Sequence, residues 1–148
     1  MNRRINQAGL DLLKQFEGFS SDAYKDVAGI WTIGYGFTNG VKPGDKITKE
    51  GAELRLRIEL MEYENAISQY VQRDLTDNQF SSCVVLAYNI GAKAFHGSTL
   101  CRLLNTHTPI KDCAKWFLPW NKATINGKLT EVRGLTNRRQ AEMELFLK

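Results

Sequence analysis

The sequence predicts an α+β protein with a small antiparallel sheet early in the chain and helices over most of the remainder. Apolar residues first recur at helical spacing near the N-terminus, and a block rich in Gly, Thr, Ile and aromatic residues follows over 27–48. Helical periodicity then dominates from residue 49 onward. Because strands and helices are segregated rather than alternating, this order favours α+β over α/β.

The length of 148 residues allows one domain that spans 1–148 and is built of two lobes. We expect 17–48 to form a small β lobe, and 73–148 together with the N-terminal helix to form a helical lobe. A connecting helix over 49–72 would join them. A cleft between two lobes is a common place for a ligand site.

An N-terminal helix is predicted that should end at Gly18. Its apolar residues recur at mostly helical spacing and are Ile5, Leu10, Leu12, Leu13 and Phe16. Glu17 then lies on the last turn, where the negative end of the helix dipole opposes a second negative charge. Partial burial beside neighbouring aromatic residues would act in the same direction. We therefore expect Glu17 to hold its proton more readily than an exposed glutamate.

The block 27–48 contains the turn signals Asn39-Gly40 and Pro43-Gly44, which indicate a small antiparallel sheet. Asp26 and Thr32 should flank the first turn of that sheet. Thr48 is expected to cap the long helix over 49–72. The apolar stripe of this helix consists of Leu56, Leu60, Tyr63, Ile67, Tyr70 and Val71.

The second half of the chain is predicted to be mostly helical. Thr76 and Gln79 match a capping box, and they open an almost wholly apolar helix that Gly91 should end. The further expected elements are a short helix over 99–105, a helix with Pro109 at its first position, a tight turn at 125–128 between short extended pieces, and a last helix capped by Thr136 and ending at Phe146.

Composition and cysteine usage limit the classes of protein. The chain has 43% hydrophobic and 24% charged residues, which is typical of a folded globular domain. No stretch reaches the roughly 20 apolar residues of a membrane span, and we expect neither a secretory signal nor stable membrane insertion. Cys83, Cys101 and Cys113 have no paired spacing, which favours buried free thiols over disulfides or a zinc site with the two histidines. We expect no metal and no cofactor.

The net charge of +4 comes entirely from the C-terminal part, because 111–148 holds eight basic and four acidic residues. A basic segment suits an acidic polymer, either a nucleic acid or an anionic cell envelope. A merely soluble surface is the alternative. A nucleic-acid role would depend on this excess and on Trp31, Trp116 and Trp120, and no known nucleic-acid module is present.

Glu17, Asp26 and Thr32 lie close together in sequence on elements that should meet at a lobe edge. Two carboxyl groups in different environments are the machinery of glycoside hydrolysis, in which one donates a proton and the other activates water. Glu17 would be the acid, Asp26 the base or electrostatic partner, and Thr32 a holder of the water. From the residues alone, a solvated surface acid is the favoured interpretation of Glu17. Asp26 could be a turn residue and Thr32 an ordinary strand residue.

A family resemblance adds weight to the catalytic interpretation. The stretch FEGFSSDAYKDVAGIWTIGYGFTNG resembles the catalytic signature of the phage-type lysozymes, the family that includes phage T4 lysozyme and the lambdoid phage endolysins. The matching elements are Glu17-Gly18, Tyr24-Lys25-Asp26, Gly29 and Thr32 to Gly36. The resemblance continues through LTDNQFSSCVVLAYNIGAKAFHGSTLCRLLN and the closing GLTNRRQAEMELFL.

The resemblance implies a two-lobed lysozyme-like fold in which the first helix packs against the helical lobe. It implies a muramidase that cuts the β-1,4 bond between N-acetylmuramic acid and N-acetylglucosamine in peptidoglycan. The family's catalytic Glu, Asp and Thr fall on Glu17, Asp26 and Thr32, with inversion as the expected outcome. By the family's pattern Tyr88 and Thr99 would face the sugar cleft, although core packing for Tyr88 and helix capping for Thr99 are open alternatives.

One position departs from the family's pattern, because Phe37 stands where many members carry a histidine after the TIGYG run. That histidine is a structural partner near the site, so we expect altered stability or substrate contact with the chemistry retained. The resemblance also implies an endolysin that acts as a monomer. It would be made in the host cytoplasm and reach the wall through a separate holin-like factor or by phage delivery.

Two rival functions remain at this point. A lytic transglycosylase cleaves the same bond without water, needs the glutamate and can dispense with the aspartate. A wall-binding module that has lost catalysis is the rival from another class. The intact set of Glu17, Asp26 and Thr32 favours hydrolysis over both.

Overall fold

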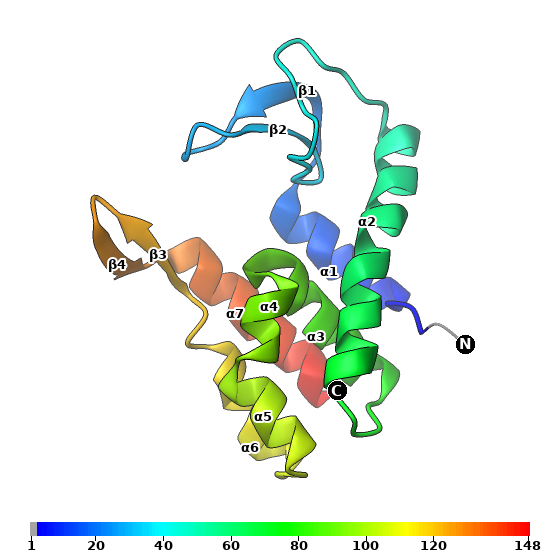
Figure 1. Cartoon of the computed structure of the whole chain (residues 1–148), viewed down its shortest axis with the longest axis vertical. Coiled ribbons are helices and arrows are strands. Elements are labelled where there is room, and N and C mark those ends of the chain that lie inside the picture. The colour runs from blue at the N-terminus through cyan, green and yellow to red at the C-terminus, as the bar shows by residue number, and fades with distance from the viewer. Residues whose placement is uncertain (1–2) are drawn as a thin grey trace.

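A long helix, α2 (Lys49–Tyr70), runs between a small β lobe and a larger helical lobe in the computed structural model, which describes residues 3–148 (Figure 1). The α+β fold class predicted from the sequence is confirmed. The other elements are α1 (Gln7–Glu17), β1 (Ser20–Lys25), β2 (Trp31–Gly34), α3 (Asp77–Ile90), α4 (Ala92–His96), α5 (Thr99–Asn105), α6 (Ile110–Ala114), the 3-10 helix η1 (Lys115–Phe117), β3 (Lys122–Ile125), β4 (Lys128–Glu131) and α7 (Arg133–Leu147).

The β lobe is built on the antiparallel pair β1 and β2, in which Tyr24 lies opposite Thr32. The first strand precedes the 27–48 block in which the sheet was predicted. Asn39-Gly40 and Pro43-Gly44 do form turns, but these turns do not join paired strands. The chain after β2 returns to β1 through one bridge, between Asp22 and Lys46. The segment after Gly40 has too few apolar residues in alternation to form a third strand of this sheet.

The helix starts follow local capping chemistry. The Thr48 side chain accepts from the Gly51 N–H, and Thr76 forms the complete predicted capping box with Gln79. Helix α5 has the predicted bounds, and its cap is Ser98 rather than Thr99. Pro109 is the N-cap of α6 and not its first helical residue, so that prediction was wrong by one position.

The C-terminal part differs from the prediction in two respects. The short extended pieces predicted on either side of 125–128 are confirmed, but they pair as β3 and β4 into a second antiparallel hairpin, so the sheet early in the chain is not the sole β structure of residues 3–148. Its turn has Asn126 and Gly127 in the left-handed region, with φ values of 51° and 78°, as the Asn-Gly pair indicates. Helix α7 begins at Arg133, so Thr136 is not its cap. The Thr136 hydroxyl instead accepts a hydrogen bond from the Asn121 amide, and its N–H already donates to the Val132 carbonyl.

The core of the helical lobe surrounds α3, which packs against α1, α2, α4 and α7. Helix α1 therefore belongs to this lobe even though it leads directly into the β lobe (Figure 1). All three cysteines are buried and free. Within residues 3–148 no helix is long and apolar enough to cross a membrane.

Phe37 is 1% exposed and anchors the β lobe. Its ring packs edge-on against Tyr35, and the Arg55 guanidinium of α2 lies 4.7 Å from the ring centroid. The left-handed Gly34 makes room for this ring, because a Cβ there would lie 2.6 Å from it. Position 37 is thus connected to α2 by apolar and cation–π contacts, whereas a histidine at this position would make polar contacts.

Candidate active site

A cleft with a volume of about 380 Å³ brings together residues from segment 17–38, from α2 and from α3. It is lined by the end of α1, the β lobe, α2 and the end of α3. The lining residues are Glu17, Asp26, Gly36, Thr38, Glu59, Tyr63, Tyr88 and Asn89. Two of the three predicted catalytic residues, Glu17 and Asp26, therefore share one cavity, and the lining is strongly polar and acidic.

Glu17 occupies the last position of α1, where Gly18 in a left-handed conformation (φ 69°) ends the helix. Its side chain is 17% exposed. The carboxyl lies against Gly36 of the β lobe, since a Cβ at Gly36 would come within 2.6 Å of Glu17 Oε1. Gly36 has a φ of 84°, so both its backbone and its lack of a side chain permit this close approach.

Arg138 of α7 is the partner of Glu17 that the sequence analysis missed. Its Nη1 lies 2.6 Å from Glu17 Oε2, and its Nε lies 3.2 Å from Glu142 Oε2. Arg139 contacts the same Glu142 carboxylate at 2.8 Å. Arg138, Arg139 and Glu142 are at most 5% exposed, so two cations and two carboxylates balance in a nearly water-free cluster.

This cluster modifies the expectation for Glu17. That expectation considered only the helix end and partial burial, and it did not include the Arg138 guanidinium, which contacts the carboxyl directly. The cluster also fixes the direction of the carboxyl, because Glu17 Oε2 is held from the helical lobe while Oε1 faces Gly36. The spacing of Arg138, Arg139 and Glu142 at i, i+1 and i+4 on one helix was a signal available in the sequence. It is easily read as a solvated surface pattern.

Burial raises the pKa of Glu142, and the guanidiniums of Arg139 and Arg138 oppose that change. For Arg139, burial lowers the pKa and the Glu142 carboxylate opposes the change. Each charge is thus tolerated only because its partners are present.

Asp26 begins the turn between β1 and β2, and one of its oxygens is used in that turn. Oδ1 accepts from the N–H groups of Ala28 and Ile30, both at 2.9 Å. This is the turn role raised as an alternative in the sequence analysis. Because Oδ2 has no hydrogen bond among the described residues and Asp26 lines the cleft, the turn role and a role toward a ligand are compatible.

Thr32 is 4% exposed in β2, and its hydroxyl donates to the Ile30 carbonyl at 2.9 Å. It belongs to the same turn network as Asp26, since both bind Ile30. It is not among the residues that line the cleft. The donated bond leaves the lone pairs of the hydroxyl as acceptors.

Tyr88 lies in the cleft, and Thr99 does not reach it. The Tyr88 hydroxyl donates to the Tyr35 carbonyl at 3.0 Å, so it joins α3 to the β lobe, and its ring packs against Tyr63 at 5.3 Å. Burial, followed by the charges of Glu17 and Glu59, raises the pKa of Tyr88, which keeps the hydroxyl protonated. Thr99 is the first residue of α5 and is not part of the cleft lining.

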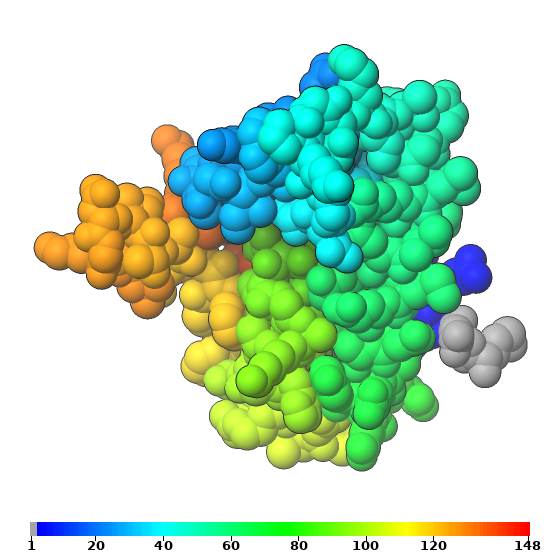
Figure 2. Space-filling view, turned by 45° about the horizontal axis from the view of Figure 1, so that its top comes forward, coloured from blue at the N-terminus to red at the C-terminus, as the bar shows by residue number. Residues whose placement is uncertain are grey.

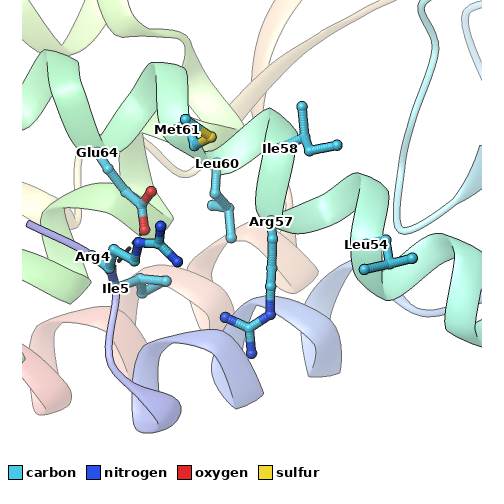
Figure 3. A pocket seen from close by; sticks show the side chains of 8 residues that line it. All are labelled: Arg4, Ile5, Leu54, Arg57, Ile58, Leu60, Met61 and Glu64. Atoms are coloured by element: carbon cyan, nitrogen blue, oxygen red, sulfur yellow. Dashed lines mark hydrogen bonds between the residues drawn. The ribbon is translucent and has the colours of Figure 1, made fainter. Parts of the chain in front are cut away.

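A second pocket, of about 240 Å³, lies between the N-terminal segment and α2 and has a different character (Figure 3). Its exposed part is an apolar stripe formed by Leu54, Ile58 and Met61. Its acid, Glu64, is 5% exposed and accepts from the Ile5 N–H, so it holds the N-terminal segment in place. This pocket contains none of the predicted site residues.

Comparison with known proteins gives a consistent result. The family model for phage lysozyme matches residues 14–142. An endolysin of Acyrthosiphon pisum secondary endosymbiont phage 1 is 42% identical over 142 residues, which cover 96% of this chain and 97% of the relative. The solved endolysin from Escherichia coli O157:H7 phage FAHEc1 is 37% identical with a TM-score of 0.93, over 99% of this chain and 95% of that one.

A structure outside the endolysins is similarly close. The muramidase domain of SpmX from Asticaccaulis excentricus is 35% identical with a TM-score of 0.91, and 99% of both chains is covered. The SAR-endolysin of Pseudomonas phage phiKMV is 33% identical over 151 residues, covering 99% of this chain and 93% of the relative. These similarities extend over nearly the whole chain. Together with the interlobe cleft, they identify an enzyme that acts on the bacterial cell wall. The chain belongs to the phage lysozyme family and is a lysozyme-type glycoside hydrolase, an endolysin that acts on peptidoglycan.

Proposed function

We propose that the chain hydrolyses the β-1,4 bond between N-acetylmuramic acid and N-acetylglucosamine with inversion, using Glu17 as the general acid. Asp26 and Thr32 position the attacking water, and Tyr88 contacts the sugar. The single observation that supports this most is the shared cleft, in which Glu17 is held by Arg138 on one side and Asp26 Oδ2 has no hydrogen-bond partner among residues 3–148. Protonation of the leaving oxygen by one acid and activation of water by another is the chemistry of inversion.

The proposal requires Glu17 to carry a proton when the sugar is bound. In the free protein the Glu17 side chain contacts Arg138 and is still 17% exposed. A sugar ring that covers this remaining surface removes water from a charged group, which favours the protonated form. The acid is thus prepared by substrate binding.

The test compares three amide variants on purified peptidoglycan. Glu17→Gln keeps the shape of the side chain but cannot donate a proton, and we expect at least a roughly 10²–10⁴-fold loss of turnover. Asp26→Asn should be severely impaired. Glu59→Gln is the matched control because Glu59 lines the same cleft without a proposed role, so its turnover should stay within a few-fold of wild type. Near-normal turnover of Glu17→Gln, with melting unchanged, would contradict the assignment.

Lytic transglycosylation is the second candidate, and one observation favours it: Asp26 Oδ1 is already occupied by two backbone N–H groups. Mass analysis of the released fragments separates the two mechanisms, since hydrolysis in ¹⁸O water adds labelled oxygen and transglycosylation leaves a 1,6-anhydro end without added water. We expect labelled, hydrated ends. Anhydro ends together with an active Asp26→Asn variant would establish the alternative.

We also propose that the chain acts as a monomer, because residues from both lobes of one chain line the cleft. It would be made in the host cytoplasm and reach the wall either after a separate holin-like factor opens the membrane or by phage delivery.

A further inference from the structure

One side of helix α2 carries an apolar stripe that is open to solvent. Leu54, Ile58 and Met61 are 67%, 68% and 46% exposed. They recur at i, i+4 and i+7, so they lie along one side of the helix. Leu56 and Leu60 of the same helix are at most 1% exposed, so α2 already has a buried face. Figure 2 shows α2 running along the surface of the molecule. A contiguous exposed stripe of this kind marks an interaction surface.

The stripe borders the pocket of about 240 Å³ between α2 and the N-terminal segment, and two arginines line that pocket (Figure 3). Arg4 and Arg57 are both exposed, and neither takes part in the ion pairs within residues 3–148. The one acid of the lining, Glu64, is 5% exposed and accepts a hydrogen bond from the Ile5 N–H. The pocket therefore presents two guanidinium groups beside an apolar surface.

The chemistry of this lining matches an anionic phospholipid surface. A guanidinium binds phosphate oxygens through two parallel N–H bonds, and apolar side chains beside it can enter the acyl boundary. Apart from the buried Glu64, the side chains of the lining are all apolar or guanidinium. A protein partner would usually require further hydrogen-bonding groups. The exposed acids of α2, Glu50 and Glu62, are not part of the lining, so the charge that faces the ligand is positive.

The stripe and the catalytic cleft lie on opposite sides of α2. Glu59 and Tyr63 of this helix line the cleft. Because successive residues of an α-helix are rotated by about 100°, Leu54 and Met61 point about 140–160° away from Glu59. A flat surface that contacts the stripe therefore leaves the cleft open and directed away from that surface.

We propose that this face, formed by Arg4, Leu54, Arg57, Ile58 and Met61, docks on the surface of an anionic phospholipid bilayer. The arginines bind headgroup phosphates, and the three apolar side chains enter the interface without any segment crossing it. So few contacts give reversible binding, and the enzyme can leave the bilayer. A molecule docked in this way directs its cleft away from the lipid, toward the polymer that it cuts. The inference goes beyond the proposed function and does not depend on the mechanism of bond cleavage.

The test measures co-sedimentation with vesicles of phosphatidylethanolamine and phosphatidylglycerol, and with vesicles of phosphatidylcholine alone. Wild type should bind the first and not the second. Arg4→Gln/Arg57→Gln should weaken binding about 25-fold, because each arginine beside an anionic surface contributes about fivefold. Arg102→Gln/Lys111→Gln is the matched control, since it removes the same charge at exposed positions of α5 and α6. This control should bind as wild type does.

A second variant, Leu54→Ser/Ile58→Ser, tests the apolar part of the face. It should weaken vesicle binding at least about tenfold, because each apolar side chain loses its burial in the interface. Its melting and its turnover on soluble peptidoglycan fragments should match wild type, since both side chains are exposed and point away from the cleft.

Three results would overturn the inference. The first is absence of wild-type binding to the anionic vesicles, which would favour an acidic protein partner. The second is an equal loss of binding in the Arg102→Gln/Lys111→Gln control, which would mean general charge attraction. The third is dimer formation without lipid that Leu54→Ser/Ile58→Ser abolishes, which would assign the face to a second copy of the chain. Vesicle binding requires no bond cleavage, so each result is independent of the proposed function.

Discussion

Replacing Arg138 by methionine is the perturbation that tests the buried cluster most directly. Arg138 is 5% exposed and contacts Glu17 at 2.6 Å and Glu142 at 3.2 Å. Methionine fills much of the same volume but carries no charge. The change leaves Arg139 as the only cation of the cluster, facing two carboxylates, of which Glu142 is fully buried.

The expected cost follows from this charge count. Removing one partner of a buried pair leaves an uncompensated charge, which costs about 3–5 kcal/mol. Glu17 can regain some hydration because its side chain is 17% exposed, so we expect the lower part of that range. For a domain of this size, about 3–4 kcal/mol corresponds to a decrease in Tm of about 6–16 °C.

The loss should depend on pH. The folded-state pKa of Glu142 is raised by burial above its ordinary value of 4.5, and removing a guanidinium raises it further. A group with a raised folded pKa contributes stability below its unfolded value and loses that contribution as the pH rises through the folded value. The deficit of the Arg138→Met variant should therefore be larger at pH 7 than at pH 4.

Urea unfolding at both pH values measures the deficit. Lys46→Met is the control, because the Lys46–Asp22 pair is largely exposed and its loss should leave the Tm close to that of wild type. The double variant Arg138→Met/Glu142→Gln should be more stable than the sum of the single changes predicts. An Arg138→Met protein that unfolds within about 1 kcal/mol of wild type would refute the reasoning, since such a small effect is typical of an exposed pair.

Three further predictions concern other parts of the molecule. Gly36→Ala should reduce turnover in a turbidity assay by about 10²-fold, because the new Cβ displaces the Glu17 carboxyl. Gly40→Ala is the control, since Gly40 is also left-handed but has open space around it; this variant should have a lower Tm and stay active. The Lys14 ammonium lowers the pKa of Glu53, so the free energy of unfolding should fall as the pH drops below 4.5. Urea unfolding at pH 7 and pH 3 measures this fall, which should be smaller in the Lys14→Met variant than in wild type. The three buried cysteines should not react with a thiol reagent in the native protein, because burial raises the pKa of each, and all three should react in denaturant; one fast native thiol would contradict this.

Features that depend on a few neighbouring residues were predictable. Thr48 and Thr76 cap their helices because a threonine hydroxyl accepts from a backbone N–H only three residues away. Asn126 and Gly127 form the hairpin turn because they tolerate positive φ. In both cases the interaction closes within one turn of the backbone, so no knowledge of the fold is needed.

Features that depend on the partner of an element were harder to predict. Thr136 has a good capping side chain, yet α7 starts three residues earlier because the Asn121 amide binds the Thr136 hydroxyl. The Arg138-Arg139 pair followed by Glu142 resembles a solvated helix face, whereas packing of α7 against α3 buries all three side chains. Burial is a property of two surfaces, and one sequence segment contains only one of them.

The sequence by itself determined the α+β class, the caps at Thr48 and Thr76, the Asn126-Gly127 turn and the identities of Glu17 and Asp26 as candidate acids. These features depend on local propensity and on chemistry carried by single residues. Only the tertiary structure decided that Glu17 is held by Arg138, 121 positions away, that Asp26 shares its cleft while also closing its own turn, and that Thr99 is not part of the cleft lining. These outcomes depend on which surfaces meet when the lobes pack, and that is set by the whole core at once.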